Sequence, residues 1–251
     1  LCVRMFGDLS CGNKRKKLRI VAKIILFGCF VCCLGVVPSG CLVVYPGPVM
    51  DLCDVLEVSE YPPKEHSFYM VSVLAQDASV LECIIAAVDS ETGLWTKSQV
   101  FGGMQPEDYA KKSREAMEES QRIATYVALR ASGIEVSDEY DLPIRVSSCT
   151  GDVAGPSAGL AFALEVLNRL GDDMIQARKI ACTGVLDSDG RVSAVGGIAQ
   201  KTIACERMGI DIFLVPKENY DEAARLAHDL MVVGVSTFQE AIAVVTYSVN
   251  P

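Results

Sequence analysis

Residues 155–170 read GPSAGLAFALEVLNRL, and this stretch combines a sharp turn with an apolar helix. Two glycines and one proline within the five residues GPSAG predict the turn. The apolar residues that follow predict a helix over 157–170. The turn places Ser157 at the helix N-terminus, where unpaired backbone N–H groups and the positive end of the helix dipole point outward.

Position alone allows three roles for Ser157. A serine at the start of a helix usually caps it. It can instead be a nucleophile whose own loop provides oxyanion donors. It can also belong to a phosphate-binding loop, although G-x-x-x-x-G-K-[ST] does not occur in the chain. Neither His66 nor His228 lies in a strand-to-helix turn or beside a candidate acid, which argues against a Ser-His-Asp triad.

A lysine provides another candidate base. Residues 198–208 (IAQKTIACERM) follow a glycine pair and predict a helix with Lys201 in its first turn. At 100° per residue, Lys201 shares an apolar stripe with Ile198, Ala204, Cys205 and Met208. Desolvation and the positive helix end both lower a lysine pKa, and a neutral amine can take a proton from a serine. The alternative is a lysine whose stem covers apolar surface while its amine reaches water.

The N-terminal part has the pattern of a membrane anchor. Residues 24–44 contain no charge, and 21 residues of helix match the hydrocarbon layer of about 30 Å. Residues 1–23 carry seven Lys and Arg against Asp8 alone, which predicts a cytoplasmic arm and an outward-facing body. A cleaved signal peptide, a lipoprotein signal at Cys41 and a buried helix are alternatives, and we expect an uncleaved anchor.

Composition excludes several classes of protein. With 50% hydrophobic residues the chain is not disordered. The body after residue 23 has 16 basic and 31 acidic groups, which argues against a nucleic-acid binder. Cys29-x-x-Cys32 lies inside the apolar run without a second pair, so we expect no metal and no cofactor.

Periodicity predicts an α+β fold in which strands and helices alternate in the second half. The predicted strands are 68–74, 81–88, 144–148, 179–186, 210–215 and 231–235. The predicted helices after the anchor are 106–132, 157–170, 198–208, 218–227 and 238–245.

Three segments together resemble the proteolytic domain of Lon-type serine peptidases: GPSAGLAFALEVLNRL, TGVLDSDGRVSAVGGIAQK (183–201) and IDIFLVP (210–216). The resemblance covers about residues 144–245 and implies a ribosomal protein S5 domain 2-like fold. It implies that Ser157 is the nucleophile and Lys201 the general base, with Thr183 near this dyad. The residues that it implies as shaping the site and its oxyanion donors are Gly155, Pro156, Ala158, Thr183, Gly196 and Gly197.

The upstream half is similar to bacterial membrane-anchored proteins with PDZ and Lon-type domains, through YPGPVMDL, PPKEHSFYMVSV and the long helix. Only about ten residues separate Gly133 from Ile144, so we expect no PDZ domain between them. Many Lon peptidases have Asp three residues before the serine. This chain has Ala154 there, and its nearest acid is Asp152.

We therefore expect a basic arm (1–23), a transmembrane helix (24–44), an extracytoplasmic segment (45–143) and a Lon-type domain (144–251). The predicted function is an ATP-independent serine endopeptidase in the cell membrane that cleaves unfolded or flexible protein segments with a Ser157–Lys201 dyad. The alternative is a non-catalytic, membrane-tethered scaffold or binding protein that keeps the fold. The expected partners are a protein or peptide substrate and the bilayer, without nucleic acid, and the chain can form a homo-oligomer.

Overall fold

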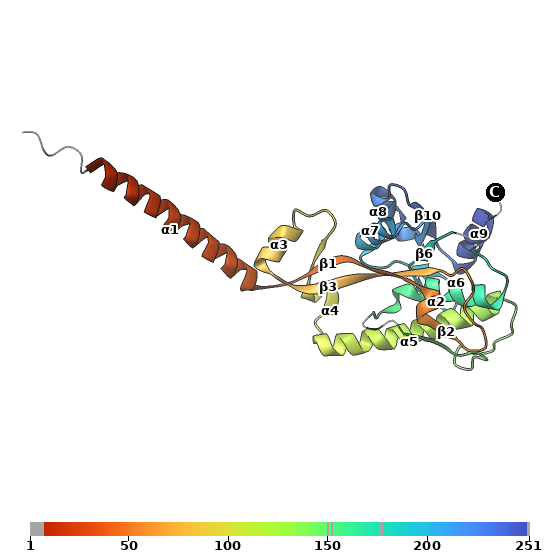
Figure 1. The fold of residues 1–251 in the computed structure, drawn as a ribbon. Helices are drawn as coiled ribbons and strands as arrows, with labels where there is room; N and C mark the ends of the chain where they lie inside the picture. Colours follow the sequence, from red (N-terminus) through yellow and green to blue (C-terminus); the bar gives the residue numbers. More distant parts are fainter. Residues whose placement is uncertain (1–7, 150, 152, 176–177, 250–251) are drawn as a thin grey trace, which may run out of the picture.

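The computed structural model describes residues 8–149, 151, 153–175 and 178–249. A long N-terminal helix extends away from a body in which helices cover both faces of a sheet (Figure 1). The mixed α/β architecture and the single N-terminal apolar helix agree with the expected fold class.

The elements follow one another in this order: α1 (Asp8–Val36), β1 (Pro38–Asp51), α2 (Leu52–Val55), β2 (Leu56–Val58), β3 (Tyr69–Ser79), α3 (Val80–Ala86), β4 (Gly93–Thr96), α4 (Lys97–Phe101), α5 (Pro106–Ala131), β5 (Val146–Ser148), η1 (Pro156–Ala158), α6 (Gly159–Leu170), β6 (Ile180–Cys182), β7 (Val185–Leu186), β8 (Val192–Ser193), α7 (Ile198–Met208), β9 (Ile212–Pro216), η2 (Lys217–Asn219), α8 (Tyr220–Leu226), β10 (Met231–Val235) and α9 (Phe238–Val249).

The main sheet has six strands in the order β10-β9-β6-β3-β1-β4. The strands β10, β9, β6 and β3 run parallel, and β1 is antiparallel to both β3 and β4. Tyr69 of β3 pairs with Ala181 of β6, so the upstream half and the second half share one sheet. The expected division at residue 144 therefore does not coincide with a structural boundary.

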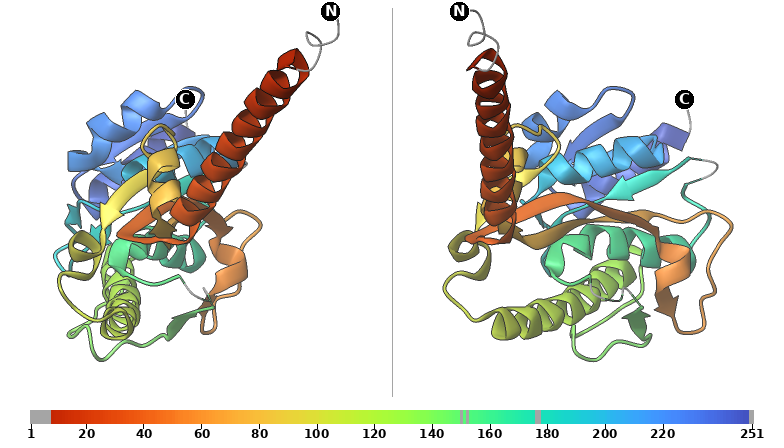
Figure 2. Two further views of the ribbon diagram at one scale, coloured as in Figure 1. Left: turned by 90° about the vertical axis from the view of Figure 1, so that its left-hand side faces the viewer. Right: turned by 60° about the vertical axis from the view of Figure 1, so that its left-hand side comes forward.

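The sheet is buried on both faces at its central strands β6 and β9, where every residue is buried. Ile212 and Leu214 of β9 belong to the core beneath α5 and α6, whereas Phe213 and Val215 belong to the core beneath α7 and α8. Alternate side chains of a strand point to opposite faces, which explains why β9 is apolar at every position. Figures 1 and 2 show α5 and α6 on one side of the sheet and α7 and α8 on the other.

A buried ion pair joins α6 to the upstream half. Glu165 and Arg169, one helical turn apart, form a 2.8 Å ion pair, and their side chains are 0% and 1% exposed. Arg169 also donates to the Leu52 carbonyl at 3.0 Å, and Glu165 accepts from the Phe68 backbone N–H at 3.1 Å. Burial raises the pKa of Glu165. These bonds satisfy both charges and fix α6 against α2 and the residue that precedes β3.

The anchor prediction of 24–44 is wrong at its C-terminal end. The helix α1 ends at Val36, and residues 38–44 lie in β1, where Leu42, Val43 and Val44 are buried. Pro38 cannot continue a helix, and Gly40 has a φ of +76°. By length and composition the candidate span is instead Lys16–Val36, of which no residue is buried. A signal sequence near the N-terminus has the same length and composition.

The predicted strand 81–88 is also wrong, because this segment contains the helix α3. Ser79 caps it by accepting from the Glu82 backbone N–H, and the Glu82 carboxylate accepts from the Ser79 backbone N–H. This reciprocal capping box favours a helix over a strand for the apolar residues that follow. Among the other predictions, the helices at 106–132 and 198–208 and the strand 231–235 are confirmed to within one residue.

Candidate active site

Ser157 lies in the short 3-10 turn η1, in front of α6. Ala158, not Ser157, occupies the N-cap position of α6, and no side-chain capping bond is formed there. Gly155 precedes the turn with a φ of +106°, a conformation that favours glycine. The capping interpretation of Ser157 is therefore wrong, and its half-buried hydroxyl points to another partner.

Two serines of α5 form hydrogen bonds with the backbone of the turn. Ser120 Oγ donates to the Pro156 carbonyl at 3.2 Å, and the Ser113 carbonyl accepts from the Gly155 backbone N–H at 3.0 Å. Because the Gly155 N–H is already engaged and proline has none, these two residues shape the turn without offering oxyanion donors. The backbone of Ser157 itself is fixed by the Gly184 N–H, which donates to its carbonyl at 2.8 Å.

Lys201, in the first turn of α7, reaches the hydroxyl of Ser157. Its Nζ lies 3.1 Å from Ser157 Oγ and 2.9 Å from Thr183 Oγ1. The lysine is only 2% exposed, and this burial lowers its pKa from 10.5 to about 8. Desolvation disfavours the ammonium form, so a large share of Lys201 is a neutral amine near pH 8. The chain therefore holds a hydroxyl against an amine that can accept its proton.

The apolar stripe expected around Lys201 is largely present. Ile198, Ala204 and Cys205 are buried, whereas Met208 is 47% exposed at the end of α7. The interpretation of Lys201 as a lysine that reaches out to water is thus wrong, since its amine points inward to two hydroxyls.

Thr183 follows β6 directly and is fully buried. Its Oγ1 donates to the Ser157 carbonyl at 3.1 Å while accepting from Lys201. Its backbone N–H donates to the Leu214 carbonyl of β9 at 3.0 Å. One side chain at the end of a central strand therefore orients both the turn of Ser157 and the amine of Lys201.

The glycine pair Gly196-Gly197 sets the start of α7. Gly197 is the N-cap, with a φ of +68°, and its carbonyl accepts from the Lys201 backbone N–H at 3.0 Å. A Cβ on Gly197 would lie 2.8 Å from Val73 Cγ1, whereas one on Gly196 would lie 3.4 Å from the ring of Trp95. The close approach of β3 to this turn requires glycine at 197. Sequence reasoning missed Val73 and Trp95.

The other residues considered in the sequence analysis either do not join Ser157, Lys201 and Thr183 or lie outside the residues that the structure describes. Ala158 is buried behind the turn, and Ala154 is exposed. Asp152 lies outside the described residues. His66 forms a 2.9 Å pair with Asp173, so the expectation that no acid lies beside it is wrong, but the Ser157 hydroxyl pairs with Lys201. The backbone of His228 donates to Glu206. Among the described residues, no three His, Cys, Asp or Glu side chains gather as metal ligands.

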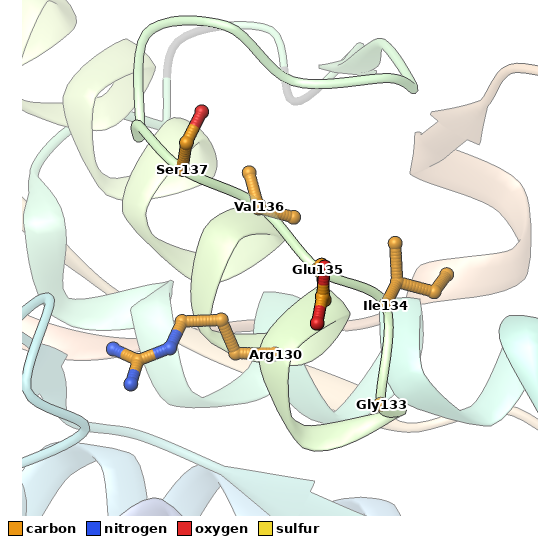
Figure 3. A pocket seen from close by; sticks show the side chains of 6 residues that line it. All are labelled: Arg130, Gly133, Ile134, Glu135, Val136 and Ser137. Atoms are coloured by element: carbon orange, nitrogen blue, oxygen red, sulfur yellow. The ribbon is translucent and has the colours of Figure 1, made fainter.

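One hollow in the described part of the chain lies away from the dyad. It has a volume of about 590 Å³, is open to solvent and lies at the C-terminal end of α5, where Figure 3 shows the residues that line it. Its lining residues are Arg130, Gly133, Ile134, Glu135, Val136 and Ser137. Ten residues of α5, or about 15 Å at 1.5 Å per residue, separate Arg130 from Ser120, which holds the Ser157 turn.

Comparison with known proteins identifies the domain. Residues 98–246 match the family described as the Lon protease (S16) C-terminal proteolytic domain, which is more than half of the chain. The match begins within α4, upstream of the expected start at residue 144.

Several curated relatives are Lon proteases. The Lon protease of Campylobacter concisus is 32% identical over 43% of this chain and 14% of its own length. Lon protease 1 of Myxococcus xanthus is 34% identical over 50% of this chain and 16% of its own length, and the Lon protease of Rhizobium meliloti is 34% identical over 52% and 17%. The chain thus spans about a sixth of the length of these relatives. It belongs to the Lon protease (S16) C-terminal proteolytic domain family of serine peptidases.

Proposed function

We propose that this chain is a membrane-anchored serine endopeptidase that hydrolyses peptide bonds with Ser157 as nucleophile and Lys201 as general base. The observation that carries the proposal is the 3.1 Å separation between Ser157 Oγ and a buried Lys201 Nζ whose pKa is lowered to about 8. A general base works best when its pKa lies near the working pH.

The chemistry proceeds in two halves. Neutral Lys201 takes the hydroxyl proton as Ser157 Oγ attacks the peptide carbonyl, and the resulting ammonium returns this proton to the leaving amine. Lys201 then takes a proton from water as the water oxygen attacks the acyl ester. It passes this proton to Ser157 Oγ as the acid product leaves, which regenerates the hydroxyl and the neutral amine. Thr183 Oγ1, 2.9 Å from Lys201 Nζ, keeps the amine directed at Ser157 in both halves.

The developing oxyanion needs donors at the turn. The backbone N–H of Ser157, in the 3-10 turn in front of α6, is our candidate, supported by the positive end of the α6 dipole. We expect Gly155, Pro156, Ala158, Gly196 and Gly197 to shape the site around these atoms.

We propose that Lys16–Val36 anchors the enzyme and that the body after Val36 is extracytoplasmic. The support is the length and apolar composition of this segment and the basic residues that precede its apolar part, which favour the cytoplasmic side. Protease added to intact cells should then degrade the domain and spare the arm. Protection of the domain until the membrane is lysed contradicts the orientation.

The substrates that we propose are unfolded or flexible protein segments, cleaved without ATP. These 251 residues contain no G-x-x-x-x-G-K-[ST] motif with which to hold nucleotide phosphates. We expect the purified chain in detergent to cleave an unfolded, dye-labelled protein equally well with and without ATP.

The matched variants separate catalysis from binding. Ser157→Ala should abolish cleavage and leave the melting temperature nearly unchanged, because the Ser157 hydroxyl does not cap α6. Ser147→Ala, an exposed serine of β5, should cleave like the parent chain. Cleavage that survives in Ser157→Ala, or none in the parent chain, rejects the peptidase and favours a binding protein that keeps the fold.

A further inference from the structure

An apolar stripe runs along the outer face of α3. Leu81, Ile84, Ile85 and Val88 follow the spacing i, i+3, i+4 and i+7, which places them on one side of a helix. Ile84 and Ile85 are 53% and 55% exposed, and Val88, just past the end of α3, is 85% exposed. Large apolar side chains exposed side by side mark a contact surface.

The opposite face of α3 already has its partner in the body. Ala86 is buried in a small cluster with Val43 of β1 and Ala78 of β3. Cys83 Sγ lies 3.1 Å from Ser39 Oγ. This inner face packs α3 against the sheet. The exposed stripe is therefore a second apolar face, which has no part in packing α3 onto the body.

The stripe begins at the C-terminal end of α1. A Cβ on Gly35 would lie 3.7 Å from Leu81 Cδ2, and the Val80 N–H donates to the Val37 carbonyl at 3.0 Å. Both views in Figure 2, like Figure 1, show α3 beside this end of α1.

The candidate span sets the depth of α3. Lys16–Val36 has 21 residues, enough for about 30 Å of helix, and its basic residues all lie at or before Lys23. The uncharged end, residues 24–36, therefore enters the hydrocarbon layer, and Gly35 lies where the helix leaves this layer on the far side. Leu81 therefore lies at this boundary as well.

We propose that the stripe Leu81-Ile84-Ile85-Val88 inserts into the interface of the bilayer that α1 spans. This inference rests on the proposed membrane anchoring. Residues 80–88 contain no Lys or Arg, so the contact is apolar and needs no anionic lipid. The stripe and α1 then form one continuous membrane surface, which holds the body at a fixed angle to the bilayer. Interfacial helices of this kind enter about 5–10 Å into the headgroup boundary.

The test uses the full chain in phosphatidylcholine vesicles. Trp95, the only tryptophan, is first replaced in Trp95→Phe, and Ile85→Trp is then added. Vesicles contain lipids brominated either near the headgroup or near the chain end, because bromine quenches tryptophan at short range. We expect the emission of the Ile85→Trp variant to be lost with headgroup-proximal bromine and largely kept with bromine at the chain end. Ile84→Trp serves if the first variant does not fold.

Two control variants on the same background keep the outcomes distinct. Phe27→Trp, in the middle of the span, should lose its emission to chain-end bromine. Met231, which is 58% exposed, lies level with the start of β3, whereas α1 lies near the other end of this strand. The emission of Met231→Trp should therefore not be quenched by either brominated lipid.

Each result has one meaning. An unquenched Phe27→Trp rejects the anchoring itself. A quenched Phe27→Trp beside an unquenched Ile85→Trp overturns the interfacial contact and leaves the anchor standing. If Ile85→Trp is unquenched and also protected from iodide in the water, protein covers the stripe, as in contact with a second copy, and the inference is likewise overturned.

Discussion

Thr183 Oγ1 lies 2.9 Å from Lys201 Nζ and accepts a hydrogen bond from it. Thr183 directly follows the central strand β6 and is fully buried, so its hydroxyl has little freedom to move. The amine of a long, four-carbon side chain is thereby directed to one place, within reach of Ser157 Oγ. Without this partner a buried amine loses both a hydrogen bond and its direction.

Removing the Thr183 hydroxyl should therefore slow the reaction. Thr183→Val keeps the shape of the side chain but removes its hydroxyl. We expect kcat to fall by about ten- to a hundredfold, because the Lys201 amine is then misplaced relative to Ser157. Thr183→Ser, which keeps the hydroxyl, should retain most of the activity. Steady-state cleavage of a fluorogenic peptide gives both values. Equal kcat values for the valine variant and the parent chain exclude this positioning role.

The buried lysine should cost stability in a pH-dependent way. Its pKa is about 8 in the fold against 10.5 normally, which corresponds to about 3 kcal/mol against the charged form. Below pH 8 both states bind the proton and this cost is fully present. Between pH 8 and 10.5 only the unfolded chain keeps the proton, so the contribution of Lys201 to stability rises with pH.

Substitution of Lys201 tests this sign. Lys201→Met should be inactive, at least as stable as the parent chain at pH 7, and without the rise in stability above pH 8. Lys201→Arg should be inactive, because a guanidinium stays protonated. The exposed Lys112→Met is the control and should change neither activity nor stability. Urea unfolding at several pH values measures the free energy of unfolding of each variant. If Lys201→Met is less stable than the parent chain at pH 7, the amine stabilises the fold and the predicted sign is wrong.

The two neighbouring glycines should respond differently to alanine. Gly197→Ala forces a side chain into a φ of +68° and within 2.8 Å of Val73 Cγ1, so we expect it to destabilise the fold by at least about 1 kcal/mol and to lower kcat by moving the start of α7. Gly196→Ala meets only an ordinary contact and should be tolerated. Val73→Ala should restore part of the loss in Gly197→Ala. Melting temperatures and kcat of Gly197→Ala, Gly196→Ala and the double variant check this, and equal losses at both glycines contradict the packing argument.

Local signals made part of the site predictable from sequence. The Pro-Gly turn located Ser157, and the stripe of residues 198–208 correctly indicated a buried Lys201 with a lowered pKa. Both features depend on residues close together in the chain, where periodicity and turn chemistry act directly.

The missed parts depend on contacts between distant residues or on competing local signals. Ser113 and Ser120 contact the Ser157 turn from α5, about 40 residues away, and their helix alone looks like a charged surface. The strand β1 contains prolines and glycines that disfavour a strand, yet pairing with β3 and β4 stabilises it. The apolar residues after Ser79 resemble a strand until the capping box is considered.

The rate at which a serine-reactive phosphonate labels Ser157, followed by mass spectrometry across pH, tests the dyad most directly. We expect an adduct at Ser157 whose rate of formation rises with pH through an inflection near 8, the pKa of Lys201, and then levels off. In Lys201→Met the labelling should be far slower and should lack this inflection. An adduct on another serine, or a rate in Lys201→Met with the same value and inflection as in the parent chain, would contradict the Ser157–Lys201 dyad.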